Sequence, residues 1–284
     1  MTFSVVGGDL RQIALASSLE KDGYDVKIFG FDKDIETNEL KKAADLDEAL
    51  LSEVIILPLP MFGDEKSVNT PFYKKSINAE ELLGKIKRDS LVFGGKIPDV
   101  IYEKYIDLKI YDYLKREEFA IANAIPTAEG AIEIAISETP HTLHDNNMLV
   151  VGYGRIGKIL ADRLAGFGAR VDISARKCTD FSWIEAQGFS PKEYENLDIG
   201  KYKIIFNTVP ALVLDEEMLK KLDKNALIID LASKPGGVDF EIAKKLGIKV
   251  IWAQSLPGKV APITSGEIIK KTVINILKEK EGFF

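Results

Sequence analysis

The chain has 284 residues, of which 46% are hydrophobic, and its formal net charge is -6 at pH 7. A chain of this size can bury two moderate hydrophobic cores. The acidic balance argues against a nucleic-acid-binding surface, and we find neither a secretory leader nor a continuous apolar run of about 18 residues, so we expect a cytoplasmic protein without a membrane segment. The single cysteine, Cys178, excludes an internal disulfide and fits a reducing compartment.

Strands alternate with helices along the whole chain, which is typical of parallel sheets covered on both faces. We therefore expect an α/β protein with two doubly wound parallel-sheet domains, the second a Rossmann dinucleotide-binding domain. Residues 1–118 are expected to form a flavodoxin-like domain that holds the substrate. Its apolar runs predict strands at 3–6, 26–29, 54–58, 91–93 and 108–110.

A glycine turn follows the first expected strand, in the sequence Gly7-Gly8-Asp9-Leu10-Arg11-Gln12. It lacks the third glycine of the dinucleotide fingerprint, so we interpret it as an ordinary turn and not as a second cofactor site. Arg11, close to a helix N-terminus, is a suitable ligand for an anion. Substrate is expected near this turn and near the turns at 58–60 and 94–96, because ligands bind at the carboxyl ends of parallel strands.

A long connecting helix is expected at residues 119–140, with small and apolar residues at helical spacing after Pro126. Glu129, beside Thr127 at the start of a helix, would lie in the cleft between the domains and is a candidate proton acceptor. It could equally satisfy the first-turn N–H groups of that helix. His141 and His144 follow without a Cys or carboxylate cluster, so we expect a surface or capping role and no metal site.

The second domain, expected at residues 141–264, contains the strongest motif of the chain. Its predicted strands lie at 148–151, 170–174, 204–207, 226–230 and 249–252. The first of these strands leads into a glycine-rich turn and then a helix. One glycine permits the tight turn, another lets a pyrophosphate approach the backbone, and the third lets the helix pack closely on the strand. The expected cofactor residues of this turn are Gly152, Tyr153, Gly154, Arg155, Ile156 and Gly157.

The end of the strand at 170–174 predicts the choice of dinucleotide. NAD enzymes carry an acid there, near Ala175, whereas this chain offers Ser174, Arg176 and Lys177. Cations suit a 2'-phosphate and a carboxylate would repel it, so NADP is favoured, with NAD as the second choice. Asp172 is the competing acid but lies inside the strand, and the alternative that the two cations are solvated loop charges stays open.

Two further segments of this half have expected roles. The turn after the strand at 204–207 is assigned to cofactor contact, with a plain strand-ending turn as the alternative. Its residues are Asn207, Thr208, Val209 and Pro210. The final segment, residues 265–284, has the spacing of a helix with a broad apolar face, which is expected to pack back on the first domain.

The order of these motifs resembles one family. Besides the glycine turns at 7–12 and 152–157, it comprises Asn123-Ala124-Ile125-Pro126-Thr127-Ala128-Glu129-Gly130, Asp230-Leu231-Ala232-Ser233-Lys234-Pro235-Gly236-Gly237 and Leu256-Pro257-Gly258-Lys259-Val260-Ala261-Pro262. Together they resemble the A subunits of dipicolinate synthase from spore-forming bacteria, over essentially the whole chain. The resemblance implies NADP-dependent oxidation of dihydrodipicolinate, an oxidation of a CH–CH bond, together with a flavoprotein-like B subunit in the mother cell during sporulation.

The implied substrate carries two carboxylates, which require cationic or hydroxyl donors. The candidates for substrate binding are Arg11, Thr127, Ser233, Lys234, Pro257 and Gly258, and the candidates for catalysis are Glu129 and Lys234. Self-association is left open.

Two alternatives remain. A 2-hydroxyacid dehydrogenase-like enzyme would pair a catalytic histidine with a carboxylate, but no histidine follows His144. A non-catalytic subunit that binds NADP and serves a partner is the other alternative.

Overall fold

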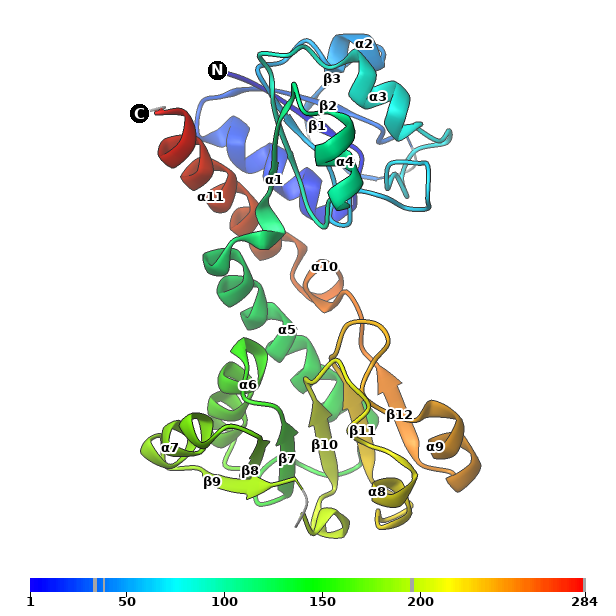
Figure 1. The fold of residues 1–284 in the computed structure, drawn as a ribbon, viewed down its shortest axis with the longest axis vertical. Coiled ribbons are helices and arrows are strands. Elements are labelled where there is room, and N and C mark those ends of the chain that lie inside the picture. The colour runs from blue at the N-terminus through cyan, green and yellow to red at the C-terminus, as the bar shows by residue number, and fades with distance from the viewer. Residues whose placement is uncertain (33–34, 38, 195–196, 283–284) are drawn as a thin grey trace. The chain divides into compact units, whose positions relative to one another are not determined.

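Within the residues that the structure describes, two six-stranded parallel sheets organise the chain (Figure 1). The structure is a computed structural model that describes residues 1–32, 35–37, 39–194 and 197–282. The chain divides into two compact units, Met1–Asn123 with Ala261–Phe284, and Ala124–Val260. The expected class, α/β with two doubly wound parallel sheets, is confirmed.

The sheet of the first unit has the strand order β3-β2-β1-β4-β5-β6. The chain builds outward from β1 in one direction and then returns to its other side with β4, so the switch point of the topology lies between β1 and β4. Without the short edge strand β3, the order of the other five strands is the flavodoxin-like one. The strands are β1 (Thr2–Val6), β2 (Asp25–Phe29), β3 (Lys41–Lys42), β4 (Val54–Ile56), β5 (Leu91–Gly94) and β6 (Lys109–Asp112).

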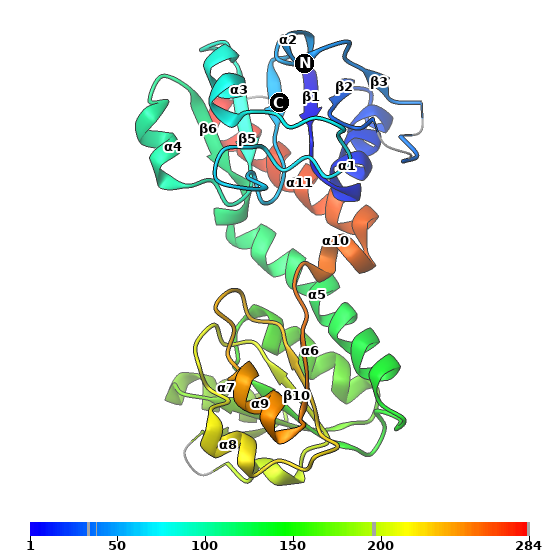
Figure 2. The same ribbon diagram turned by 90° about the vertical axis from the view of Figure 1, so that its right-hand side faces the viewer.

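Alternating side chains of this sheet pack on helices at its two faces. Phe3 and Val5 of β1 belong to the cluster that includes the apolar residues of α1 and α11, which lie side by side (Figure 2). Val6 belongs to the opposite cluster, with α2, α3 and α4. The helices are α1 (Leu10–Lys21), α2 (Leu46–Ala49), α3 (Ala79–Lys85), α4 (Asp99–Lys104), the 3-10 turn η1 (Tyr113–Lys115) and α11 (Pro262–Glu281).

The final helix, α11, belongs to the first unit, on which it packs against α1. Its apolar face contributes Ile269, Val273 and Leu277 to the core. An ion pair of 2.8 Å joins Lys270 Nζ to Asp22, which follows α1. Residues 283 and 284, the last two of the expected helix, lie outside the described residues.

The sheet of the second unit has the order β12-β11-β10-β7-β8-β9, with its switch point between β7 and β10. This is the Rossmann order, in which a dinucleotide binds across the carboxyl ends of the strands. The strands are β7 (Asn147–Val151), β8 (Arg170–Ala175), β9 (Ser190–Glu193), β10 (Ile204–Asn207), β11 (Leu227–Asp230) and β12 (Lys249–Trp252).

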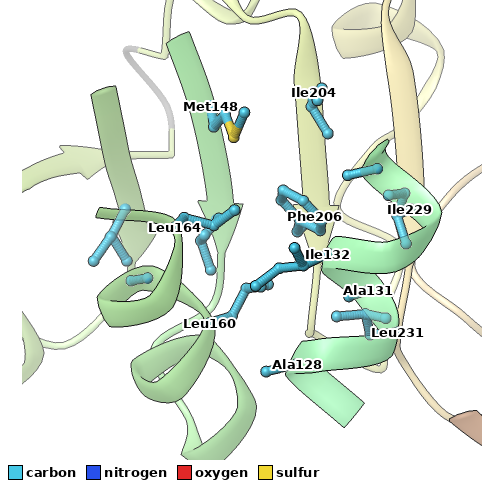
Figure 3. Packing of buried hydrophobic residues seen from close by; sticks show 14 of the residues in the cluster. Ala128, Ala131, Ile132, Met148, Leu160, Leu164, Ile204, Phe206, Ile229 and Leu231 are labelled. Atoms are coloured by element: carbon cyan, nitrogen blue, oxygen red, sulfur yellow. The ribbon is translucent and has the colours of Figure 1, made fainter. Parts of the chain in front are cut away.

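One face of this sheet is covered by α6 and the C-terminal part of α5 (Figure 3). Leu160 of α6 and Ile132 of α5 pack with Phe206 of β10. On the other face, Ile205 packs in the cluster that contains Met218 of α8. The helices are α5 (Glu117–Glu138), α6 (Arg155–Gly166), α7 (Cys178–Ala186), α8 (Glu216–Lys220), α9 (Phe240–Leu246), α10 (Leu256–Val260) and the 3-10 turn η2 (Ile199–Lys201).

The connecting helix lies close to its expected range of 119–140, but Glu129 is not at a helix start. Helix α5 starts at Glu117 and contains Pro126 in its interior, so Thr127 and Glu129 lie in mid-helix and not in a first turn. Burial of small and apolar residues on both sides of the proline offsets the hydrogen bond that proline removes. By length and hydropathy α5 could cross a membrane, but one such helix is weak evidence of a membrane span, and half of its most apolar window is buried inside the protein.

The apolar runs correctly located ten strands but missed β3 and β9. Both lie at sheet edges, where one side of the strand has no partner strand. Their sequences, Lys41–Lys42 and Ser190–Glu193, are polar and include Pro191, which an edge strand tolerates. A search for buried apolar strands cannot detect such segments.

Candidate dinucleotide-binding site

The turn between β7 and α6 needs glycine at two positions for reasons of geometry. Gly152 has φ +98°, a left-handed conformation that other residues adopt at a cost. A Cβ at this position would also collide with Thr208 Oγ1. At Gly157 a Cβ would overlap the carbonyl oxygen of Gly152, so this glycine lets the first turn of α6 lie directly on the turn that precedes it.

Gly154 occupies a different environment, because a Cβ built on it meets no atom within 4 Å. It is the N-cap residue of α6 and provides no capping side chain. The N-cap residue therefore makes no side-chain hydrogen bond to the first-turn N–H groups of this 12-residue helix. Unpaired N–H groups and the positive end of the helix dipole favour a bound phosphate, so the turn is suited to a pyrophosphate.

A pocket of about 210 Å³ opens beside this turn. The end of β8 and the start of α7 line it with Ser174, Ala175, Arg176 and Lys177, the residues predicted to contact the adenosine end of a dinucleotide. Arg176 and Lys177 are exposed, whereas Ser174 is buried at the wall. The remaining lining residues are Val151, Gly152, Tyr153, Asp180, Tyr194, Val209 and Val213.

Asp172, the competing acid of β8, is engaged elsewhere. Its carboxylate accepts hydrogen bonds from Lys201 Nζ at 2.8 Å and from the Tyr202 hydroxyl at 2.6 Å. Burial opposes ionisation of this group, but the bonds from Lys201 and Tyr202 outweigh it and hold the pKa of Asp172 below its usual value. Asp172 therefore joins β8 to the segment before β10 and is not at the position of a ribose-binding acid.

Four of the pocket residues were not among the cofactor residues expected from the sequence: Val151, Asp180, Tyr194 and Val213. Tyr194 follows the polar strand β9, and its buried hydroxyl has no hydrogen-bond partner among the described residues. Burial, together with the charge of Asp215, raises the pKa of Tyr194 to about 12. Only the return of the chain along β9 brings this ring to the pocket, so periodicity offered no sign of it.

The residues of the turn after β10 have different surroundings: some form hydrogen bonds within the fold, and others lie at the pocket or at the surface. Asn207 is buried and its amide donates to the Val209 carbonyl oxygen and to Asp230 Oδ1, so its side chain is committed to the fold. The Thr208 hydroxyl donates to the Val151 carbonyl oxygen at 3.0 Å, which ties β10 to β7 at the switch point. Val209 lines the pocket, whereas Pro210 follows it at the surface of the turn.

The glycine turn also brings side chains to its flank. The Tyr153 hydroxyl donates to Gln187 Oε1 at 2.6 Å, and Lys158 lies over the Tyr153 ring. Arg155 is exposed in the first turn of α6, and Ile156 packs against the core. The structure thus places Tyr153 in the pocket wall and Arg155 beside the proposed pyrophosphate position.

Ser233 and Lys234 lie exposed in the loop after β11, at the same carboxyl edge as the glycine turn. Pro257 and Gly258 are in the short helix α10 and not in an open loop, and Pro257 is buried. Thr127 is likewise buried within α5. These three residues therefore lie in helices, and their contact with substrate stays a prediction.

Glu129 does not occupy the expected position at a helix start. Its carboxylate lies 3.3 Å from Arg163, in the last turn of α6. Arg163 is eight residues from Arg155, which places the pair roughly 12 Å along the helix from the glycine turn. The two side chains border a largely apolar cavity of about 750 Å³ with Ile132, Phe167 and others. This arrangement favours a structural role for Glu129 over proton transfer.

Arg11 of the first unit is less free than the sequence indicated. It is 7% exposed, and its guanidinium forms a bidentate pair with Asp9, the N-cap of α1, at 2.8 to 3.1 Å. It also donates to the Leu59 carbonyl oxygen at 2.5 Å, which joins the turns after β1 and β4. Arg11 thus lies at the switch point of its sheet, but Asp9 already compensates much of its charge.

Neither the histidines nor the cysteine form a cluster. In the described part of the chain, no group of three or more His, Cys, Asp or Glu side chains is arranged to hold a metal ion. Cys178 is exposed at the start of α7.

The second unit and its site define a class of protein. Residues 127–237 match the family described as the NAD binding domain of D-isomer specific 2-hydroxyacid dehydrogenases. With the Rossmann strand order and the glycine turn, this makes the chain an oxidoreductase of the dehydrogenase type that binds a nicotinamide dinucleotide. The D-lactate dehydrogenase of Escherichia coli is similar in fold alone, with 15% identity and a TM-score of 0.62 over 100% of this chain and 98% of that one.

The whole chain identifies the family more narrowly. Residues 2–113 match the N-terminal domain of the A subunit of dipicolinate synthase. The A subunit of dipicolinate synthase from Bacillus subtilis (strain 168) is 32% identical over 98% of this chain and 96% of its own length. The crystal structure of the corresponding protein from Bacillus halodurans has a TM-score of 0.88 and 32% identity, over 98% of both chains. The protein belongs to the family of dipicolinate synthase A subunits, as the resemblance in its sequence predicted.

Proposed function

We propose that this protein oxidises dihydrodipicolinate to dipicolinate, pyridine-2,6-dicarboxylate, with NADP as the hydride acceptor. The proposal rests on the 32% identity with a dipicolinate synthase A subunit over 98% of the chain. We further propose that it acts with a flavoprotein-like B subunit, in the cytoplasm of the mother cell of a sporulating bacterium.

The proposed cofactor is supported by the fit of a dinucleotide to the second unit. The open space beside Gly154 suits a pyrophosphate at the N-terminus of α6. Arg176 and Lys177 would hold the 2'-phosphate of NADP, while the buried Ser174 offers a hydroxyl at the wall. Asp180 adds one carboxylate to the same pocket, so NAD is the competing ligand.

The proposed reaction removes one hydride and one proton from the dihydropyridine ring, and formation of the aromatic ring drives it. A bound nicotinamide supplies the acceptor for the hydride. The chain must then hold the ring in the correct orientation, and the proton must pass to a base. We propose that Ser233 and the ammonium group of Lys234 hold a substrate carboxylate, because both side chains are exposed at the carboxyl edge of the sheet, where water can take up the proton.

The test is to assay the purified full chain for substrate-dependent reduction of NADP, both by itself and with the B partner. Dipicolinate formation by either preparation supports the proposal. Binding of NADP without turnover in both preparations would favour the non-catalytic role.

The 2-hydroxyacid dehydrogenase alternative receives a parallel assay with a panel of 2-hydroxy acids. Its motivation is the matched dinucleotide-binding domain at residues 127–237. No histidine follows His144, so the chain lacks the catalytic histidine of that class. We expect no turnover of these substrates.

A further inference from the structure

Asp230, the last residue of β11, is a fully buried carboxylate with an unusual set of partners. Its Oδ1 atom accepts hydrogen bonds from Asn207 Nδ2 at 2.8 Å and from the Ala232 backbone N–H at 3.0 Å. Its Oδ2 atom accepts from the Gly237 backbone N–H at 2.8 Å. Three N–H donors therefore converge on one carboxylate at 0% exposure.

These donors come from two separate segments at the carboxyl edge of the sheet. Asn207 ends β10, whereas Ala232 and Gly237 lie in the loop between β11 and α9, on either side of the exposed residues 233–235. Asp230 thus closes the loop on itself and fastens it to the neighbouring strand.

The loop is folded tightly around this carboxylate. A Cβ at Gly237 would overlap Asn207 Nδ2, and one at Gly236 would lie 2.9 Å from Asp230 Oδ2. The outer face of the loop is also held, because Trp252 Nε1 donates to the Ala232 carbonyl oxygen at 2.9 Å. The base of the loop is therefore rigid.

The tip of the same loop is exposed. Ser233, Lys234 and Pro235 face solvent, while Ala232, Gly236 and Gly237 are buried. Burying a carboxylate is costly unless hydrogen bonds compensate it, and here the compensation fixes a loop that presents two polar side chains. A rigid base under exposed functional groups is the arrangement that preorganises a site.

We propose that Asp230 is a positioning residue for the nicotinamide half of the site. This inference rests on the proposed function, in which a dinucleotide lies across the switch point between β7 and β10. The pocket of the adenosine half is built on β8, on one side of that point, and the loop after β11 is on the other side. Asp230 holds Ser233 and Lys234 at a constant position relative to Thr208 and Val209, which follow Asn207.

The experiment compares Asp230→Ala and Asp230→Asn with the wild type, using two probes. NADP reports on the whole dinucleotide site, whereas 2',5'-ADP reports on the adenosine half alone. For Asp230→Ala we expect about tenfold weaker binding of NADP, unchanged binding of 2',5'-ADP, and a kcat about a hundredfold lower, because misplacement by an ångström is enough for such a loss.

Asp223→Asn is the matched control. This aspartate lies just before β11, at the amino ends of the strands. Its carboxylate accepts hydrogen bonds from the Asn225 backbone N–H at 2.8 Å and from Lys203 Nζ at 2.9 Å. It orders a turn as Asp230 does, but far from the proposed site. We expect both probes to bind it as they bind the wild type.

Hydrogen exchange at the loop amides provides a readout without any ligand. In Asp230→Ala the amides of Ala232 and Gly237 should both exchange faster. In Asp230→Asn the remaining carbonyl oxygen can still accept hydrogen bonds from the Asn207 side chain and from the Ala232 amide. We therefore expect only the amide of Gly237 to exchange faster. Faster exchange across the whole second unit would show a general structural role and would overturn the proposal.

The outcomes separate this inference from the proposed function. If the wild type binds neither probe, the proposed function fails, and the exchange pattern alone decides whether Asp230 orders the loop. If the wild type binds both and Asp230→Ala binds NADP and turns over normally, the positioning role is refuted while the proposed function stands. Equal weakening of NADP and 2',5'-ADP also refutes it.

Discussion

The choice of NADP over NAD depends on Arg176, and its replacement by alanine tests that choice directly. Arg176 follows the last residue of β8 and lines the pocket beside the glycine turn. Only NADP presents a 2'-phosphate, so Arg176→Ala should weaken NADP binding and leave NAD binding nearly unchanged.

The size of the effect follows from the exposure of the side chain. A hydrogen bond to a charged group contributes about 1.5 to 3 kcal/mol. Arg176 is exposed, so water and salt screen its charge, and Lys177 remains beside it in the variant. We therefore expect the lower end, about 1.5 kcal/mol, which is roughly a tenfold increase in the Kd of NADP.

The assay is calorimetric titration of NADP and NAD into the wild type and two variants. Arg170→Ala is the matched control, because Arg170 is the first residue of the same strand and therefore lies at the end of β8 that is away from the pocket. There it forms an ion pair of 2.6 Å with Asp145. The control should bind both cofactors normally. An equal loss of NADP and NAD affinity in Arg176→Ala would place Arg176 outside the phosphate pocket and refute the argument from charge.

Three further changes test other parts of the molecule. Gly154→Val should abolish NADP binding without lowering the thermal midpoint, because its side chain enters space that is open in the protein; retained affinity would contradict a pyrophosphate there. Arg11→Gln should raise the KM for dihydrodipicolinate and leave the Kd of NADP unchanged. It should also lower the free energy of unfolding by about 1 to 3 kcal/mol, because the hydrogen bonds to Asp9 and Leu59 are lost. An unchanged KM would remove Arg11 from the substrate site. Asp172→Asn should destabilise the chain at neutral pH by about 1 to 2 kcal/mol. The folded pKa of Asp172 is lowered, so its stabilisation is present above its usual value of 3.8 and is lost as the pH falls through the folded pKa; chemical unfolding should show the wild type and this variant converging in acid, and a constant difference would exclude the ion pair as the cause.

The local sequence was sufficient for the elements whose cause is local. A buried strand such as β10, Ile204–Asn207, needs a short run of apolar residues, and that run identifies it without any knowledge of its neighbours. The turn at Gly152 is equally local, since a strand, a glycine with positive φ and a helix N-terminus follow each other in the chain. The cations at the end of β8 were visible for the same reason.

Contacts between distant segments decided the remainder. The sequence placed Glu129 at a helix start. In the structure α5 already begins at Glu117 and continues through Pro126, so Glu129 lies within the helix and pairs with Arg163. Likewise, nothing local to Arg11 indicates that the Leu59 carbonyl oxygen, 48 residues away, would occupy its guanidinium.

The family and the dinucleotide turn could thus be recognised from short motifs and their order along the chain. The roles of individual polar side chains could not, because a carboxylate or guanidinium takes its role from the partners that the folded chain brings to it. Asp230 is the clearest instance, since two of its donors come from the loop that follows it and the third, Asn207, reaches it only when β10 and β11 pair.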